Sequence, residues 1–126
     1  MLIAKTSLQG DFEWHQFFDS KLSGNSLILS PNEQSALFST RWVNPVEDHS
    51  SLVRVAVNSG AIISTTQFDD FVIQNLASTN DGSWIYATGK YYTGPRNYFQ
   101  LIQYNLDAGV VEFSMRDWIN DNVEGI

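Results

Sequence analysis

Asn58-Ser59-Gly60 divides an aliphatic run at Leu52–Val57 from another at Ala61–Ile63, and this stretch decides the fold. An Asn-x-Gly step between two apolar runs predicts a tight β-hairpin, because glycine readily adopts the left-handed backbone conformation that the turn needs. About 49 residues later, Asp107-Ala108-Gly109 divides two further apolar runs in the same way. The chain therefore encodes one hairpin twice at a fixed spacing.

A second turn recurs upstream of each hairpin. Pro31–Phe38 has its counterpart in Thr79–Tyr86, about 48 residues further on, so two different turns repeat in the same order. A period of roughly 40–50 residues with four apolar runs per unit is typical of a β-propeller blade. We therefore predict an all-β fold of two four-stranded antiparallel blade-like sheets, a half β-propeller, with short N- and C-terminal capping segments. Residues 1–126 are expected to form a single domain, with repeats at about 22–66 and about 71–115.

The apolar runs define the expected strands of each unit. In the first unit these are Ser26–Leu29, Ser35–Val43, Leu52–Val57 and Ala61–Thr66. In the second they are Phe71–Ala77, Ser83–Thr88, Tyr98–Leu106 and Val110–Met115. The polar stretches Asn44–Ser50 and Tyr92–Asn97 are expected to be loops between the second and third strands of their units.

The segments outside the repeats are rich in aromatic residues. Leu2–Ala4 is expected to form a short strand, whereas Asp11–Phe18 fits either a strand or one amphipathic helical turn. Because two blades do not close a ring, the chain must cap itself, oligomerise or keep an open face for a partner. The candidate capping side chains are Phe12, Trp14, Phe17, Phe18, Trp118 and Ile119.

The composition narrows the class of protein. With 43% apolar and 13% aromatic residues, the chain is expected to bury a core. Cysteine is absent, which excludes disulfides and Cys-ligated zinc. The formal net charge of −7 argues against nucleic acid as a partner and fits either simple solubility or a basic protein partner. The N-terminus lacks a signal-peptide pattern and no apolar run is long enough to span a bilayer, so a cytoplasmic protein without membrane contact is expected.

The predicted strand order collects several loops at one end of the molecule. Four carboxylates and a group of aromatic residues would lie there, on loops held by a rigid scaffold. The predicted partner-binding residues are Glu47, Asp48, Asp69, Asp70, Tyr91, Tyr92 and, beside them, Trp42. The alternative is an acidic rim that serves only solubility.

Catalytic and metal-binding patterns are weak. Only His15 and His49 could act as bases near neutral pH, and the chain has no nucleophile-elbow motif. Glu47-Asp48 and Asp69-Asp70 could ligate calcium only if they converged. We therefore predict no catalytic residues, no metal site and no cofactor, and a chain that is a monomer when alone or a weak dimer.

One stretch carries a family resemblance. Asn80–Tyr86, followed by Leu101–Gly109, resembles a blade of the WD40 or YVTN propeller kind, in which a DG turn opens the second strand and a D-x-x-x-G hairpin closes the third. The resemblance covers roughly residues 22–115. It is weaker in the first unit, where Glu33-Gln34 replaces Asp-Gly and no Trp-Asp pair ends a strand.

In size, acidity and lack of cysteine, the chain also resembles the small immunity proteins of contact-dependent growth inhibition systems, although no shared motif carries this likeness. It implies a non-enzymatic protein that covers the basic active-site cleft of a nuclease-type toxin domain. The four loop carboxylates would then mimic phosphates, and Tyr91, Tyr92 and Trp42 would be apolar anchors. The alternative is a carbohydrate- or small-ligand-binding module with Trp42, Tyr91, Tyr92 and Trp84 stacked on sugar rings. A His- or metal-dependent hydrolase is disfavoured.

Overall fold

The computed structural model describes the backbone of residues 1–43, 46–93 and 96–119, with the side chains in these ranges except 43, 46–48, 92–93, 96–97, 113 and 116–119. Every regular element in these ranges is a strand, which confirms the all-β prediction. The strands are β1 (Leu2–Thr6), β2 (Phe12–Phe17), β3 (Leu22–Leu29), β4 (Ser35–Val43), β5 (Val46–Ala56), β6 (Ile62–Phe68), β7 (Phe71–Ser78), β8 (Trp84–Thr93), β9 (Arg96–Asn105) and β10 (Val110–Ile119).

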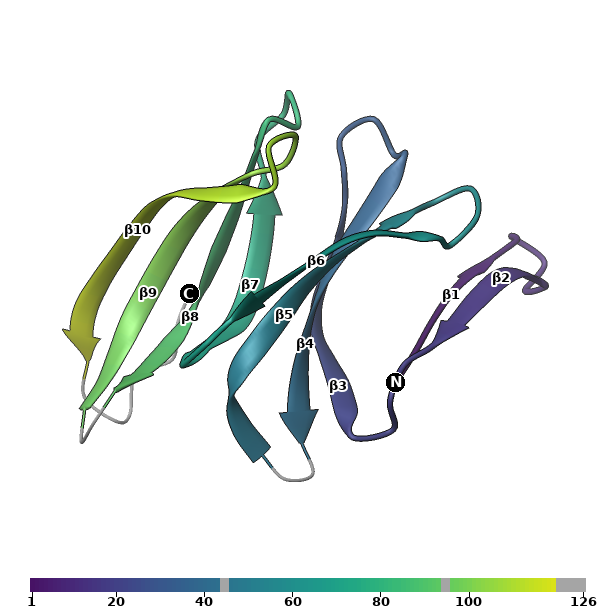
Figure 1. Ribbon diagram of the computed structural model, residues 1–126. Coiled ribbons are helices and arrows are strands. Elements are labelled where there is room, and N and C mark those ends of the chain that lie inside the picture. Colours follow the sequence, from purple (N-terminus) through teal and green to yellow (C-terminus); the bar gives the residue numbers. More distant parts are fainter. Residues whose placement is uncertain (44–45, 94–95, 120–126) are drawn as a thin grey trace.

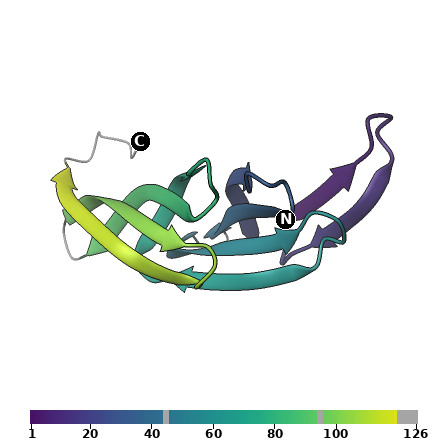
Figure 2. The same ribbon diagram turned by 90° about the horizontal axis from the view of Figure 1, so that it is seen from above.

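The strands form three antiparallel sheets, none of which closes within the described residues (Figure 1). The hairpin β1–β2 is one sheet, and the other two have the orders β3-β4-β5-β6 and β10-β9-β8-β7. In both larger sheets, strands that follow one another in sequence also pair. Seen from above, the sheets lie in a row, with the hairpin at one end, β3–β6 in the middle and β7–β10 at the other end (Figure 2).

The hydrogen bonds of the tight turns show that the two larger sheets repeat each other. The hydroxyl of Ser30 donates to Asn32 Oδ1 at 2.6 Å, and that of Thr79 donates to Asp81 Oδ1 at 2.7 Å. These turns are 49 residues apart, one more than the offset of about 48 predicted from the sequence. Glu33, with a φ of 58°, is thus the counterpart of Gly82, with a φ of 75°.

The hairpins and bulges repeat with the same offset. Gly60 and Gly109 have φ angles of 75° and 71°, and each donates its N–H to the carbonyl four residues earlier. A register shift between Gly24 and Ser26 in the β3–β4 pair recurs between Ile73 and Asn75 in the β7–β8 pair. The 49-residue repeat is therefore a repeat of backbone geometry as well as of sequence.

Several predicted boundaries were wrong because strand pairing extends beyond the apolar runs. β5 begins at Val46, so Glu47 and Asp48 lie in a strand and not in a loop. β8 continues to Thr93 and pairs with β9 from Arg96, so only positions 94–95 of the predicted loop remain, and they lie outside the described residues. β3 begins at Leu22, four residues before the predicted strand start at Ser26.

In the part of the chain that the structure describes, two apolar cores lie between neighbouring sheets. The larger lies between the four-stranded sheets and contains Leu37, Leu52, Phe71, Ile73, Ile85, Ala87, Ile102, Tyr104 and Leu106. The smaller lies between the hairpin and the opposite face of β3–β6, and contains Ala36, Phe38, Val53 and Val55 with Met1, Ile3, Trp14, Phe18 and Val57 around them. Burial on both faces of β3–β6 explains why its central strands are apolar at consecutive positions.

The N-terminal segment caps the first unit as a strand pair, which excludes the helical alternative for Asp11–Phe18. The Trp14 indole N–H donates to the Val57 carbonyl at 2.6 Å, and Phe18 packs edge-on against Phe38. Phe12 and Phe17 were wrongly predicted as caps, because their side chains are 64% and 74% exposed. The side chains of Trp118 and Ile119 lie outside the described part of the chain, although both residues belong to β10.

Candidate functional site

The predicted partner-binding residues lie, by their backbone positions, at one end of the two larger sheets. Trp42 is close to the end of β4, and Glu47 and Asp48 are at the start of β5. Asp69 and Asp70 connect β6 to β7, and Tyr91 and Tyr92 are close to the end of β8. Because neighbouring strands are antiparallel, these strand ends share one side of the molecule, opposite the turns at 30–34 and 79–83 (Figure 1).

The Asp69-Asp70 turn is the best-defined part of this end. Both residues are exposed, and Gln67 Nε2 donates to Asp69 Oδ1 at 3.3 Å. Asp70 has a φ of 57°, a left-handed conformation that Asp tolerates better than most residues. On either side of the turn, the rings of Phe68 and Phe71 meet edge to face with centroids 5.8 Å apart. Two adjacent carboxylates are thus presented to solvent on a turn that is held by packed rings.

Side chains of the first unit hold the strand that follows this turn. Within the described ranges, β7 is an edge strand, so the backbone groups on its outer side have no strand partner there. The buried Ser50 hydroxyl donates to the Phe71 carbonyl at 2.7 Å and accepts from the Ile73 N–H at 3.2 Å. Asn25 Nδ2, at the β3 bulge, donates to the Ile73 carbonyl. These bonds give partners to edge backbone groups of Phe71 and Ile73 and position the Asp69-Asp70 turn relative to β5.

The other predicted residues are described to different extents. Tyr91 is half-buried, packs on the larger core and lies 6.5 Å from the Tyr98 ring, centroid to centroid. Trp42 is half-buried and pairs with Leu22. The side chains of Glu47, Asp48 and Tyr92 lie outside the described residues, so only their backbone can be placed at this end.

The aromatic platform expected for sugar binding does not assemble. Trp84 begins β8, at the end of the sheet opposite to Tyr91, so these two rings cannot stack on one sugar with Trp42. Trp84 also lies outside the core, where Ile85 takes the buried position. No group of three metal-ligating side chains occurs among the described residues, and none of the described elements is a helix able to cross a membrane.

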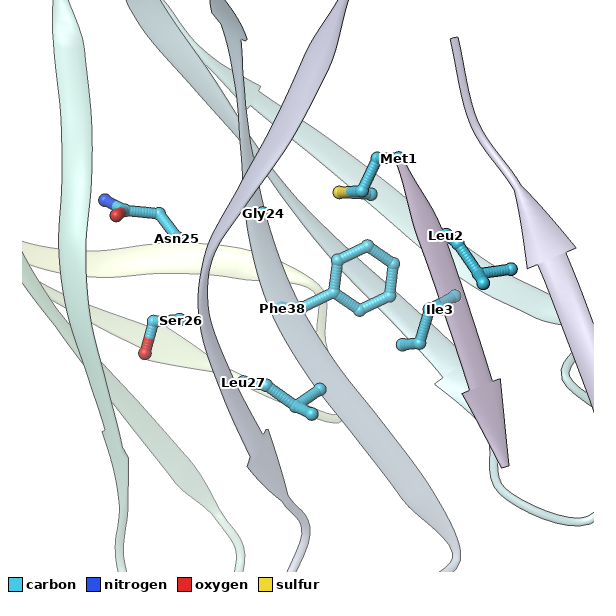
Figure 3. Close-up of a pocket in the computed structure, with 8 residues that line it drawn as sticks. All are labelled: Met1, Leu2, Ile3, Gly24, Asn25, Ser26, Leu27 and Phe38. Atoms are coloured by element: carbon cyan, nitrogen blue, oxygen red, sulfur yellow. The ribbon is translucent and has the colours of Figure 1, made fainter. Parts of the chain in front are cut away.

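A cavity of about 390 Å³ lies between β1 and β3 (Figure 3). Met1, Ile3, Leu27 and Phe38 supply its apolar wall, whereas the Asn25 side chain points to the other side of the β3 ribbon (Figure 3). Its size is that of a small-molecule pocket, roughly 300–1,000 Å³, but such pockets also contain a few converging polar groups. Sequence reasoning missed this cavity because it forms between segments whose packing no local pattern reveals.

A smaller polar cavity of about 140 Å³ lies between the two repeated turns. There Arg54 Nε donates to the Ser35 hydroxyl at 3.1 Å, and Arg54 Nη1 donates to the Leu106 carbonyl at 3.4 Å. On the rim of this cavity, two hydrogen bonds to the Asp81 carboxylate hold its pKa below the ordinary value. The Thr79 hydroxyl donates the bond with the larger effect, and the Ser83 N–H donates the other. The bond from Arg54 to Leu106 joins the two units, and the bonds to Asp81 stabilise the turn at 79–83.

No protein-family model matches the chain, and no curated protein sequence matches it. Two solved structures are similar to it. The structure of U3-55K is 12% identical over 78% of this chain and 40% of that chain, with a TM-score of 0.46. A protein of unknown function from Bacteroides caccae is 11% identical over 89% of this chain and 53% of that chain, with a TM-score of 0.47. The chain therefore spans about half or less of the length of both structures.

Proposed function

We propose that the protein is a non-enzymatic binding protein whose partner is a basic protein. The observation that carries this proposal is the exposed Asp69-Asp70 turn, fixed between two packed rings at the end of the molecule where Glu47 and Asp48 also begin a strand. A pair of carboxylates in a fixed geometry attracts a cationic surface and loses little conformational entropy on binding.

The overall charge supports the same kind of partner. A formal net charge of −7 on 126 residues accelerates encounter with a basic protein through long-range attraction. The carboxylates of the turn would give the local complementarity, and Trp42, Tyr91 and Tyr92 would supply apolar contacts at the same end.

In its most concrete form, the protein is an immunity protein that neutralises a nuclease-type toxin. A nuclease cleft is basic because it holds phosphates, so an inhibitor with clustered carboxylates can occupy it by imitating the charge of the substrate. The proposal also includes the fold, a half β-propeller of two blades. Turns, hairpins and bulges that recur 49 residues apart support it.

The test compares two double variants that change the net charge equally. Asp69→Lys with Asp70→Asn alters the proposed site, and the asparagine keeps a residue that tolerates the left-handed conformation. The matched control, Asp107→Lys with Asp11→Asn, alters two exposed carboxylates in other turns. Each immobilised protein is exposed to lysate of its host at low salt, and the retained polypeptides are identified by mass spectrometry.

We expect the wild type and the control to retain the same basic polypeptide, which high salt releases, and the Asp69/Asp70 variant to lose it. Retention of that polypeptide by all three proteins would place the binding surface elsewhere. Retention of no basic polypeptide by the wild type would contradict the proposed function.

A further inference from the structure

The repeat leaves one face of β7–β10 less covered than the matching face of β3–β6. In the first unit, Ser35, Leu37 and Leu52 are at most 3% exposed. Their counterparts 49 residues later, Trp84, Tyr86 and Leu101, are only half-buried. Among the described residues, the difference lies in the neighbouring sheet, since β7–β10 packs on this face of β3–β6.

Across three layers of paired residues, this open face has no charged side chain and combines large apolar residues with neutral polar ones. Trp84, Asn105 and Val110 form one layer, and Thr88, Leu101 and Met115 form another. Between them lies the pair Tyr86 and Gln103, joined by a hydrogen bond of 3.1 Å. Val110 and Met115 are 47% and 46% exposed. Exposed aromatic, aliphatic and methionine side chains without charged neighbours are the composition typical of the centre of a protein–protein interface.

The opposite end of the row of sheets also exposes apolar side chains. One face of the β1–β2 hairpin packs on β3–β6 through Ile3 and Trp14, so the alternate residues face away from the molecule. There the His15 ring contacts Phe12 and Phe17 edge to face, with centroids 5.8 and 5.1 Å away. Leu2, which pairs with Phe17, is 50% exposed.

We propose that a second copy of the chain covers the open face of β7–β10 with the outer face of its hairpin, so that copies associate head to tail. The proposed contact continues the order in which the sheets already stack within one chain. Within one chain, the hairpin packs on β3–β6 and β3–β6 packs on β7–β10, and a hairpin placed on β7–β10 extends the same row by one sheet (Figure 2). The same contact therefore buries both the open face of β7–β10 and the outer face of the hairpin.

Charge favours these two surfaces for contact between identical chains. Copies that each carry a formal net charge of −7 repel one another, so a stable contact must avoid placing carboxylates against carboxylates. The three layers on β7–β10 contain no acidic residue, and the paired residues Leu2, Ala4, His15 and Phe17 contain none either. The contact is heterologous, so it closes into a ring or continues as a chain of copies.

Each surface can be blocked by one charge at an exposed position. Phe17→Glu blocks the hairpin, and Met115→Glu blocks the sheet, with Val110→Glu as a replacement if Met115→Glu does not fold. The control is Ile63→Glu, because Ile63 is 51% exposed and its counterpart 49 residues later is Glu112. Circular dichroism and thermal unfolding verify that each variant is folded.

The association constant is measured by sedimentation velocity over a concentration series. The wild type and Ile63→Glu should self-associate, and both blocking variants should lose at least about tenfold in association constant, because burying a carboxylate in an apolar contact is costly. A mixture of Phe17→Glu with Met115→Glu should restore a dimer of one copy of each, since one intact pair of surfaces remains. Native mass spectrometry with one variant isotopically labelled identifies this mixed dimer.

A wild type that stays monomeric throughout the series would overturn the inference. Self-association that survives Phe17→Glu would overturn it as well, because the sheet faces would then pair with each other. A mixture that remains monomeric would contradict the head-to-tail contact. These outcomes are independent of the basic partner, since none of the variants alters Asp69 or Asp70.

Discussion

The hydroxyl oxygen of Ser50 lies 2.7 Å from the carbonyl oxygen of Phe71, and this hydrogen bond fastens the second repeat to the first. The same hydroxyl accepts from the Ile73 N–H at 3.2 Å, so one buried side chain satisfies two backbone groups on the free edge of β7. β7 begins directly after Asp70, so this contact also positions the carboxylates of Asp69 and Asp70 relative to β5.

Ser50→Ala should lower the free energy of unfolding by about 2 kcal/mol, because it leaves a buried N–H and a buried carbonyl without partners. Urea denaturation measures the change. Ser23→Ala is the control, because that hydroxyl is exposed and bonds only the adjacent carbonyl at 3.4 Å, and it should change stability by less than about 0.5 kcal/mol. Equal effects of the two substitutions would contradict the anchoring role of Ser50.

Gly89→Ala should destabilise the fold by roughly 1–3 kcal/mol, the usual cost of an overpacked core. A Cβ at this position would lie 1.9 Å from the Val72 carbonyl oxygen, which is backbone and can only move with β7. At Gly24 a Cβ would meet Met1 Sδ at 3.2 Å, and that flexible side chain can move aside. Thermal unfolding should therefore show a large loss for Gly89→Ala and a small one for Gly24→Ala.

The equivalent turn positions Glu33 and Gly82 should respond in opposite directions. Glu33 has a φ of 58°, so Glu33→Gly should relieve strain and raise stability by up to about 1 kcal/mol. Gly82→Ala should lower stability by about 1–2 kcal/mol, because alanine at a φ of 75° is strained. Chemical denaturation of both variants provides the comparison. Destabilisation by both substitutions would show that the Glu33 side chain contributes more than its backbone strain costs.

Asp81 should make part of the stability depend on pH. Its folded pKa is lowered from the ordinary value of 3.8 by hydrogen bonds from Thr79 and Ser83, so its contribution is present above that value and is lost as the pH falls through the lowered folded pKa. Asp81→Asn keeps the turn, since Asn32 accepts the equivalent bonds in the first unit. The difference in melting temperature between wild type and Asp81→Asn should be constant near neutral pH and shrink below about pH 4. A difference that does not vary with pH would contradict this.

Sequence alone predicted the parts of the fold that local patterns encode. β4 has the predicted bounds Ser35–Val43, and both Gly-containing hairpins form where expected, because their turn chemistry is local. The start of β5 was missed because the residues from Glu47 to Ser51 are all polar, and pairing of Ser50 with Phe68 extends the strand through them. The start of β3 was missed because the bulge at Asn25 interrupts the alternation of apolar residues.

The candidate site was predictable only in outline. The two residues between β6 and β7 could be assigned to a turn at one end of the sheets, which is where Asp69 and Asp70 lie. The bonds from Ser50 and Asn25 to β7 could not be predicted, because they join residues 21 to 48 positions apart across two sheets. The difference in burial between Leu37 and Tyr86 likewise depends on which sheet covers which face.

The most direct test of the proposed function is the association rate constant with the captured basic partner, measured by stopped flow over a range of ionic strengths. We expect a rate that falls steeply with salt for the wild type and for the control Asp107→Lys with Asp11→Asn. For Asp69→Lys with Asp70→Asn, we expect a slower rate with a much weaker salt dependence. The same rate and the same salt dependence in all three proteins would contradict binding through the Asp69-Asp70 turn.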